Sequence, residues 1–310
     1  MQKKEYRLRN IKYYNESLVK RGDIRLWVDD EVLENWYAEP EESGTLFQRV
    51  YSDDCIKCGL RLRALYQLPL RALQGFLISL FAFAGIFLDV PHFSTFSRRQ
   101  EKLSVELERN SSSESAYIAV DSTGIKVFGE GEWKTRVHGY SHRRTWRKLH
   151  LAVDPESHEI RAVCVSTNDF KDGELLDSLL DQIEESPKKV FADGAYESFD
   201  NYKSVVDHGA EPVIPPRKDA KIKQHGNSKK DPLPRDEVVR AVKKLGRKRW
   251  KEESLYHLRS ISETAMFRFK NTFGDKLLSR TFKRQAIELI DKCNMLNIMT
   301  ELGMPDSAMI

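Results

Sequence analysis

Residues 148–166 read KLHLAVDPESHEIRAVCVS. Apolar and polar side chains alternate in both halves, KLHLAVD and EIRAVCVS, and the turn-forming residues PESH at 155–158 lie between them. Alternation over this length is typical of strands, because successive side chains point to opposite faces of a sheet. The stretch therefore predicts a β-hairpin with a polar turn.

Further strand and helix patterns flank the hairpin. The shorter strand patterns are YIAVDS at 117–122, KVFAD at 189–193 and PVIP at 212–215. Leucine and isoleucine at helical spacing predict an amphipathic helix over 173–184, and a second helix is predicted over 199–208, closed by Gly209. Three strands followed by helix, strand, helix and strand is the order of a ribonuclease-H-like α/β core, in which the first and fourth strands are central neighbours.

Two long helical patterns close the chain. One helix is predicted over 255–273, where Gly274 ends it, and another over about 283–302. We expect both to complete a catalytic domain that spans residues 115–304. The serine-rich sequence SSSES at 111–115 is typical of a linker and separates this domain from the residues before it.

Residues 1–110 carry mainly helical patterns. Helices are predicted over 55–68 and 70–83, and Ser94 is a good N-cap for a basic helix that reaches about Leu103. Helix, short turn and basic helix is the outline of a helix-turn-helix, although an ordinary helical bundle fits the same pattern. The prediction is an all-α DNA-binding domain. Its candidate DNA contacts are Arg98, Arg99 and Lys102.

The basic residues are concentrated in two segments. The formal net charge is only +4, yet residues 134–148 hold six Lys or Arg and no Asp or Glu. Residues 217–251 hold fourteen Lys or Arg against four Asp or Glu, a local excess of ten. Such density favours contact with a polyanion, and two solvated surface loops are the alternative. Within the predicted catalytic domain, 217–251 is a basic insertion.

Cysteine usage and hydropathy narrow the class of protein. Cys55 and Cys58 form CIKC with no further ligands nearby, so we predict buried helical thiols rather than a zinc site. The longest apolar run, FLISLFAFAGIFL at 76–88, is shorter than the roughly 20 residues that a membrane span needs. No apolar signal core follows the basic N-terminus. We therefore predict a soluble, cytoplasmic protein.

Several histidines and tryptophans have less specific interpretations. His138, His142 and His150 are interpreted as structural or DNA-facing, because Gly139 and the basic neighbours disfavour a helical zinc site. Trp133, Trp146 and Trp250 have no assigned role. Trp250 either stacks on a base or, more commonly for tryptophan, lies in a core or interface.

Three carboxylates are candidates for metal binding. Asp121 closes the first predicted strand, Asp193 closes the fourth, and Glu263 lies in the helix predicted over 255–273. Ligands gather at strand ends in α/β sheets, so a carboxylate on a helix beside those ends completes a cluster. Three carboxylates at one point repel each other, which favours their protonation. Two Mg²⁺ ions about 4 Å apart would remove this repulsion and would support in-line phosphoryl transfer. The alternative is that both aspartates cap the turns that follow them.

One face of the predicted helix 255–273 carries an unusual set of side chains. Tyr256, Arg259, Glu263 and Lys270 fall within an arc of about 60° at ~100° per residue. Arginine and lysine beside a metal-binding carboxylate are placed to hold DNA phosphates, and a tyrosine can contact the sugar–phosphate or stack on a base. The alternative is a solvated helix with an i,i+4 Arg–Glu pair.

These residues resemble a known family. The sequence YHLRSISETAMFRFK at 256–270 is similar to the YREK signature of bacterial insertion-sequence transposases. The blocks that resemble the fifth insertion-sequence family are DSTGIKVFGEGEW at 121–133, WRKLHLAVD at 146–154, FADGAYES at 191–198, and LPLRALQGFLISLF with FSTFSRRQ in the N-terminal region. The similarity extends from about Tyr13 to Pro305. The YREK string alone is moderately specific, and intervals of 72 and 70 residues between the three acids make the combination strong.

The resemblance implies a DDE transposase, an enzyme that cuts and joins DNA. Its three carboxylates would bind two Mg²⁺ ions, with Mn²⁺ as a substitute and no small-molecule cofactor. Tyr256, Arg259 and Lys270 would help to hold the element's end, the basic insertion would touch DNA, and the N-terminal domain would recognise terminal inverted repeats. The expected partners are double-stranded DNA, as element ends and target, and further copies of the chain. The expected place is the bacterial nucleoid, away from membranes.

Two rival functions use the same features. A host nuclease or resolvase of this fold needs the three carboxylates but performs no strand transfer. A non-catalytic DNA-binding protein descended from a transposase needs only the DNA contacts.

Overall fold

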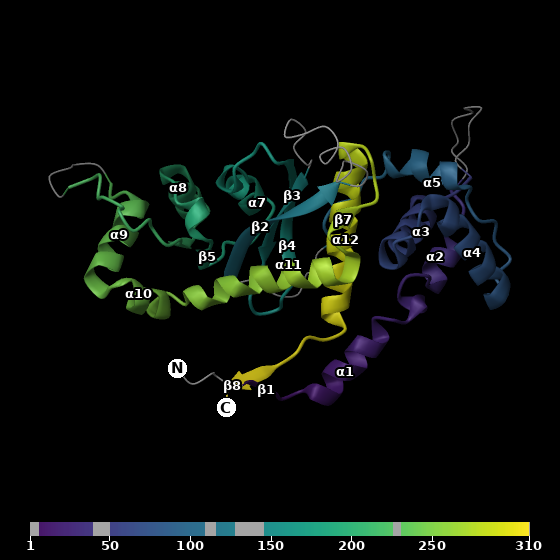
Figure 1. Ribbon diagram of the computed structural model, residues 1–310, viewed down its shortest axis with the longest axis horizontal. Helices are drawn as coiled ribbons and strands as arrows, with labels where there is room; N and C mark the ends of the chain where they lie inside the picture. Colours follow the sequence, from purple (N-terminus) through teal and green to yellow (C-terminus); the bar gives the residue numbers. More distant parts are fainter. Residues whose placement is uncertain (1–5, 40–49, 109–115, 128–145, 226–230, 310) are drawn as a thin grey trace, which may run out of the picture. The chain divides into compact units, whose positions relative to one another are not determined.

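The computed structural model describes residues 6–39, 50–108, 116–127, 146–225 and 231–309 (Figure 1). Residues 107–275 form one compact unit, and residues 1–106 together with 276–310 form the other. The catalytic domain predicted over 115–304 differs from this division, because the last long helix belongs with the N-terminal helices. The serine-rich linker predicted at 111–115 lies outside the described residues.

The unit of residues 107–275 is built on a mixed sheet. Its strands are β2 (Tyr117–Val127), β3 (Trp146–Val153), β4 (Ile160–Thr167), β5 (Lys189–Phe191) and β6 (Glu211–Val213). They lie in the order β4-β3-β2-β5-β6. β3 is antiparallel to both β2 and β4, whereas β5 is parallel to both β2 and β6. This confirms the predicted hairpin, the three-stranded meander and the ribonuclease-H-like order.

One face of this sheet is covered by short helices. They are η2 (Asp172–Leu175), α7 (Leu176–Leu180) and α8 (Phe199–Asp207). Alternate residues of β2 point to this side, so Ile118 and Val120 join α7 and α8 in one buried cluster. The helix predicted over 173–184 is shorter, because residues 172–175 form the 3₁₀ segment η2 and α7 ends at Leu180. Beyond this end, Gln182 accepts a hydrogen bond from the Val163 N–H of β4 at 3.2 Å.

Four further segments follow the sheet in sequence. They are α9 (Pro234–Leu245), α10 (Arg247–Glu253), the 3₁₀ segment η4 (Tyr256–Arg259) and α11 (Ser260–Phe273). Trp250 of α10 packs in a second cluster with Ala119 of β2 and Phe191 of β5, on the face opposite α7 and α8. Trp250 is 6% exposed, so it is a core residue, the commoner of its two interpretations. Much of the basic stretch 217–251 is therefore folded against the sheet.

The other unit is mainly helical. Its elements are β1 (Tyr6–Leu8), α1 (Ile11–Lys20), η1 (Ile24–Leu26), α2 (Asp30–Glu34), α3 (Asp53–Tyr66), α4 (Leu70–Ala84), α5 (Phe93–Gln100), β7 (Lys276–Leu277), α12 (Phe282–Glu301) and β8 (Ser307–Met309). β1 pairs with β8, and α3 contacts α4, α5 and α12. α3, α4 and α12 confirm three helices that the sequence predicts.

Two sequence-based expectations concern α3 and α4. Cys55 and Cys58 are buried in α3, and burial raises the pKa of the Cys58 thiol to about 12, so both are core thiols as predicted. Among the described residues no single helix is long and apolar enough to cross a bilayer. α3 and α4 reach that length and composition only as a pair bent by 107°.

The predicted helix-turn-helix takes a different form. α5 begins at Phe93 with His92 as its N-cap, because the His92 ring, rather than Ser94, accepts from the first turn. α5 ends at Gln100, short of the predicted Leu103. Residues 85–92 separate α4 from α5, which is more than the three or four residues of a helix-turn-helix connection.

The three basic residues predicted to contact DNA from this region differ in their surroundings. Arg99 donates a hydrogen bond to the Tyr51 carbonyl at 2.7 Å and forms an ion pair with Asp53. Its side chain is 12% exposed, so its guanidinium ties α5 to the start of α3. Arg98 and Lys102 are exposed and stay candidates for DNA contact.

Gly59 marks the closest approach of α3 to α5. A Cβ at Gly59 would lie 2.3 Å from the buried Phe96 ring. We expect Gly59→Ala to lower the free energy of unfolding by about 1–3 kcal/mol, because overpacking outweighs the gain in helix propensity. Gly75→Ala in α4 is the matched control, since nothing lies within 4 Å of its added carbon. Urea unfolding should show that control unchanged or stabilised by about 0.5–1 kcal/mol, and equal losses would contradict the close approach.

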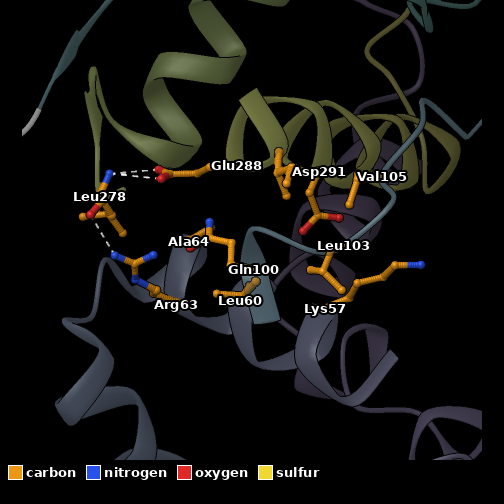
Figure 2. Close-up of a pocket in the computed structure, with 11 residues that line it drawn as sticks. Lys57, Leu60, Arg63, Ala64, Gln100, Leu103, Val105, Leu278, Glu288 and Asp291 are labelled. Atoms are coloured by element: carbon orange, nitrogen blue, oxygen red, sulfur yellow. Dashed lines mark hydrogen bonds between the residues drawn. The ribbon is translucent and has the colours of Figure 1, made fainter. Parts of the chain in front are cut away.

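A buried ion pair fastens α12 within its unit. The Glu288 carboxylate accepts from the Leu278 N–H at 3.0 Å, the Ser279 N–H at 2.9 Å and Lys292 Nζ at 2.7 Å. Figure 2 shows Glu288 pointing towards Leu278, whose carbonyl accepts from Arg63 of α3 at 2.9 Å. A cavity of about 20 Å³ lies beside these groups, enough for about one water. Buried charges and backbone groups thus join α12 to α3.

Candidate active site

The register of β2 and β5 places two aspartates on one face of the sheet. Ala119 of β2 pairs with Phe191 of β5, and both belong to the cluster that contains Trp250. Asp121 and Asp193 each follow two residues later, so the alternation of side chains directs them to the same face. Because β2 and β5 are parallel, the two carboxylates also lie towards the same edge.

The sequence predicted that Asp121 closes its strand, and this prediction is wrong. β2 continues to Val127 because it stays paired with β3, where Asp121 lies opposite Leu151. Pairing with β5 ends at Ala119 and Phe191. Asp121 therefore lies just beyond the point where β2 and β5 stop pairing. Its side chain can face a ligand there, as a side chain at a strand end can.

Both aspartates also accept a hydrogen bond from the backbone that follows them. Asp121 accepts from the Ser122 N–H at 2.8 Å, and Asp193 accepts from the Ala195 N–H at 2.7 Å at the start of the 3₁₀ segment η3 (Gly194–Tyr196). The capping interpretation is thus correct for Asp193, whereas Asp121 is followed by more strand and not by a turn. Each contact uses the Oδ1 atom, which leaves Oδ2 for another partner, so these contacts and ligand binding are compatible.

Glu263 comes from the first turn of α11, which packs on β2 and β3. The single helix predicted over 255–273 is interrupted, because Leu255 has φ +64° and residues 256–259 form the 3₁₀ segment η4. The prediction that one regular helical face carries Tyr256 through Lys270 is therefore wrong. Glu263 and Lys270 share α11, while Tyr256 and Arg259 precede its first residue.

Arg259 joins two of the three acids. Its Nη1 lies 3.2 Å from Asp121 Oδ2, and its Nη2 makes a short contact with Glu263 Oε1. The i,i+4 Arg–Glu pair therefore exists, but the arginine side chain is only 18% exposed and it reaches the sheet as well. One guanidinium fork thus spans a strand residue and a helix residue that are far apart in sequence.

The pKa of Asp121 reports the charges around it. Burial is the largest cause of its raised pKa, and the carboxylates of Asp193 and Glu263 raise it further. The Ser122 N–H and Arg259 oppose this increase. All three acids therefore lie close enough to interact electrostatically. Tyr256 lies within the same field, because Asp193, Asp121 and Glu263 each raise the pKa of its phenol, although burial is the larger cause.

Aromatic and basic side chains surround Tyr256. The Trp250 ring centroid is 6.2 Å from that of Tyr256, and Lys251 Nζ lies 4.6 Å from the Tyr256 ring. Arg259 is 5.9 Å from the same ring. Two cations thus lie over the Tyr256 ring beside the carboxylates, an arrangement suited to an oxygen-rich anion such as a phosphodiester.

The three carboxylates suit a hard divalent cation. Magnesium takes oxygen ligands and fills its remaining positions with water and phosphate oxygens. Arg259 is already a cation held between two of the acids, so the site stabilises positive charge at that point. Among the described residues, the group whose ligand atoms all lie within 4.8 Å of one another is Asp177, Asp181 and His208, on the surface. The ligand atoms of Asp121, Asp193 and Glu263 are therefore more widely separated than those of this surface group.

Two family models match the chain, and both are described as a transposase DDE domain. One covers residues 113–298, which is 186 of the 310 residues, and the other covers residues 19–130. The chain belongs to the DDE transposase family. It is a phosphoryl-transfer enzyme that catalyses DNA transposition, and DDE transposases generally use divalent metal ions.

The transposase holds a polar cluster that sequence reasoning missed. Ser122, His150, Asp172 and Tyr196 lie on the face of the sheet opposite Asp121, where Ser122 pairs with His150 across β2 and β3. Lys148 fixes the Asp172 carboxylate at 3.0 Å. The signal available was the alternation of β2, which places Ser122 behind Asp121. Asp172 had no such signal, because it lies outside the strands, at the start of η2.

Glu197 is a second feature of the transposase that sequence reasoning missed. It directly follows η3 and its side chain is 5% exposed. Arg235 of α9 donates to it at 2.5 Å, and Arg217 lies 3.3 Å from it. Two basic residues of the stretch 217–251 are therefore held by ion pairs to the segment that follows η3. The exposed lysines of that stretch, such as Lys218, Lys243 and Lys248, stay candidates for DNA contact.

Several predicted features of the transposase lie outside the described residues. They are Trp133, His138, His142 and most of the basic segment 134–148. His150 is described and is structural, because it is fully buried and its Nε2 lies 2.9 Å from the Ser166 hydroxyl.

His150 predicts a loss of stability in acid. Burial lowers its pKa from 6.5 to about 4, so between these values the unfolded chain binds a proton that the folded chain refuses. The free energy of unfolding should therefore fall by up to about 3 kcal/mol as the pH drops through this range. His150→Gln should flatten that fall in urea unfolding measured across the range.

His208 supplies the opposite case. Burial alone would lower its pKa, but its bonds to the Ser204 carbonyl and Asp181 raise it above the ordinary value. Its contribution to stability is present below its unfolded pKa and is lost as the pH rises through the raised value. His208→Gln should therefore leave the fall between pH 6.5 and 4 unchanged, and should remove a gain in stability that wild type shows as the pH falls from the raised pKa towards 6.5. A changed slope below pH 6.5 in this variant would contradict the assignment.

Proposed function

We propose that this enzyme is a YREK-type transposase of the fifth insertion-sequence family, and that Asp121, Asp193 and Glu263 hold two Mg²⁺ ions, or Mn²⁺ in their place. The observation that carries the proposal is the guanidinium of Arg259, which contacts both Asp121 and Glu263. The pKa of Asp121 is raised first by burial and then by its acidic neighbours, and Asp193 is one of these neighbours. This supports Asp193 as the third member of the group.

The protein's part in catalysis is to hold the carboxylates on rigid elements. When bound, the two ions activate the attacking oxygen and stabilise the leaving oxygen of an in-line displacement. β2 and β5 fix Asp121 and Asp193 through their register, and the packing of α11 on β2 and β3 fixes the start of the helix that carries Glu263. Side chains supported in this way keep a productive geometry with little reorganisation.

The surroundings of the carboxylates favour a DNA end as substrate. Tyr256 and Arg259 lie beside the acids, and Lys270 lies about two turns further along α11. Their positive charge and the tyrosine ring fit phosphates and an exposed base at the end of an element. The exposed lysines of 217–251 extend the positive surface on the same unit.

The remaining parts of the proposal concern partners. The unit of N-terminal helices recognises terminal inverted repeats, with Arg98 and Lys102 as its exposed candidates. Copies of the chain assemble on two element ends, cut each end to free a 3′-OH, and direct that hydroxyl against a phosphodiester of the target. The hydroxyl oxygen forms the new bond to phosphorus while the target's 3′ oxygen leaves, so one phosphodiester is exchanged for another.

A strand-transfer assay tests this proposal. The substrate is a duplex that ends in the inverted repeat flanking the gene, labelled on each strand in turn, together with a supercoiled target plasmid and Mg²⁺. We expect cleavage at the repeat and a labelled product joined to the plasmid. A duplex with a scrambled repeat is the control and should give neither product.

The other outcomes point to the rival functions. Cleavage at the repeat without joined product, even with ends that are already cut, favours a nuclease or resolvase. Repeat-specific binding without cleavage in either Mg²⁺ or Mn²⁺ favours a non-catalytic DNA-binding derivative. Either result would contradict the proposal.

A further inference from the structure

We propose that Arg259 is an internal counter-ion of the carboxylate site, which occupies Asp121 and Glu263 until a DNA end draws it away, so that divalent-ion binding and DNA-end binding are coupled. The proposal rests on the proposed function, because it takes these acids to be the ion ligands. It concerns the regulation of the site, which the DDE assignment leaves open.

The contacts of Arg259 set up a competition for the same oxygens. Its two terminal nitrogens contact Asp121 Oδ2 and Glu263 Oε1. Asp121 Oδ1 already accepts from the Ser122 N–H, so an ion drawn to Oδ2 would compete with Arg259 for that oxygen. A divalent ion placed there would also repel the guanidinium at short range. Ion binding is therefore opposed while Arg259 keeps these contacts.

The charge and burial of Arg259 make this contact significant without an ion. Arginine stays protonated at all relevant pH values, so its positive charge is permanent. The Arg259 and Asp121 side chains are 18% and 17% exposed, so solvent screens this pair only partly. The Glu263 side chain is 56% exposed, so it can swing towards an ion or towards solvent more easily.

The surroundings give the displaced guanidinium another partner. Arg259 and Lys251 lie on the ring of Tyr256, at 5.9 Å and 4.6 Å, so two cations flank this ring. A phosphate bound beside Tyr256 offers Arg259 a bidentate contact that replaces its carboxylate contacts. A DNA end thus frees the acids when it arrives, and ions bind weakly until then. Binding linkage requires the reverse effect to be equal.

The test measures Mn²⁺ affinity by electron paramagnetic resonance, with and without the element-end duplex at fixed ionic strength. In the DNA-free protein, Arg259→Gln should bind Mn²⁺ about ten-fold more tightly than wild type, because one competing charge is removed. Adding the duplex should raise the Mn²⁺ affinity of wild type by a larger factor than that of Arg259→Gln. This difference is the part of the coupling that Arg259 carries, and the thermodynamic cycle of one substitution and one ligand isolates it.

Arg249→Gln is the matched control. Arg249 forms an i,i+4 pair with Glu253, the same spacing as Arg259 and Glu263, but its side chain is 70% exposed and it lies in α10. This variant should leave Mn²⁺ affinity unchanged. Arg259→Lys is the second variant, since an ammonium cannot bridge both acids with a planar fork, and it should give a smaller gain than the glutamine variant.

The outcomes separate this proposal from the proposed function. If Glu263→Gln weakens Mn²⁺ binding while Arg259→Gln and Arg259→Lys fail to strengthen it, the counter-ion role is overturned and the ion site stands. If Glu263→Gln and Asp121→Asn leave Mn²⁺ binding unchanged, the ion site itself is wrong. Equal effects of the duplex on wild type and Arg259→Gln would overturn the coupling. Thermal melting of each variant shows whether it is folded.

Discussion

Asp121→Asn, Asp193→Asn and Glu263→Gln should each lower the rate of DNA-end cleavage by about a thousand-fold or more, while binding of the element end stays within a few-fold of wild type. Each substitution removes a negative ligand and keeps the size of the side chain. The loss is large because charge stabilisation at the reacting phosphate is the main contribution of such a site. Single-turnover cleavage and gel-shift binding in Ca²⁺ measure the two quantities.

Glu252→Gln is the control for these variants. Glu252 is an exposed acid in α10, on the same unit but outside the carboxylate group. The same chemical change there should leave cleavage within about two-fold of wild type, as surface substitutions usually do. Full activity in any one of the three acid variants would contradict the assignment of that residue.

Glu288→Gln should lower the free energy of unfolding by about 3–5 kcal/mol, the cost of leaving one partner of a buried ion pair uncompensated. Glu288 is 8% exposed and Lys292 is 2% exposed, so water cannot replace the lost charge. The carboxylate also accepts from two backbone N–H groups that bring Leu278 and Ser279 against α12. Chemical denaturation followed by circular dichroism measures the loss.

Glu253→Gln is the matched control for this prediction. Glu253 and Arg249 form an exposed i,i+4 pair, 48% and 70% exposed, so removing the charge should cost no more than about 1 kcal/mol. Similar losses in the two variants would contradict the role of burial.

The buried pair of Glu288 and Lys292 also predicts a loss of stability in acid. Burial alone would raise the pKa of Glu288, but Lys292 and the backbone donors outweigh it and hold the pKa below 4.5. Its contribution is therefore present above that ordinary value and is lost as the pH falls through the lowered pKa. Glu288→Gln should remove this part of the acid dependence.

The sheet could be predicted because its signals are local. The hairpin of β3 and β4 follows from alternation on both sides of a polar turn, and the position of Asp121 and Asp193 follows from strands that precede them. The length of β2 was missed, because pairing with β3 extends it through Ser122 and Gly124, which are weak strand formers.

The region before Glu263 could not be predicted from spacing. Leu255 adopts φ +64°, which is unfavourable for leucine and is held by the packing of Trp250 and Tyr256 on the sheet. That packing depends on tertiary structure. The residues of the YREK pattern were found through their types and intervals, whereas the contact of Arg259 with Asp121 needs the fold.

The sequence also contains no sign that α12 belongs to the unit of the N-terminal helices. Glu288, Asp291 and Lys292 are charged, so periodicity assigns them to a solvated face, whereas the fold buries them against α3 and its neighbours. The ion pair of Arg99 with Asp53 was hidden for the same reason, because a basic residue in a short helix gives no sign that an acid of another helix will bind it.

The convergence of three distant carboxylates on one ion site can be measured directly by iron-mediated backbone cleavage. Fe²⁺ bound in place of Mg²⁺ is treated with ascorbate and peroxide, and the fragments of end-labelled protein are mapped. We predict cuts near Asp121, Asp193 and Glu263 together, all of which disappear in Asp121→Asn. Cuts confined to the exposed group of Asp177, Asp181 and His208, or cuts at only one of the three acids, would contradict a shared site.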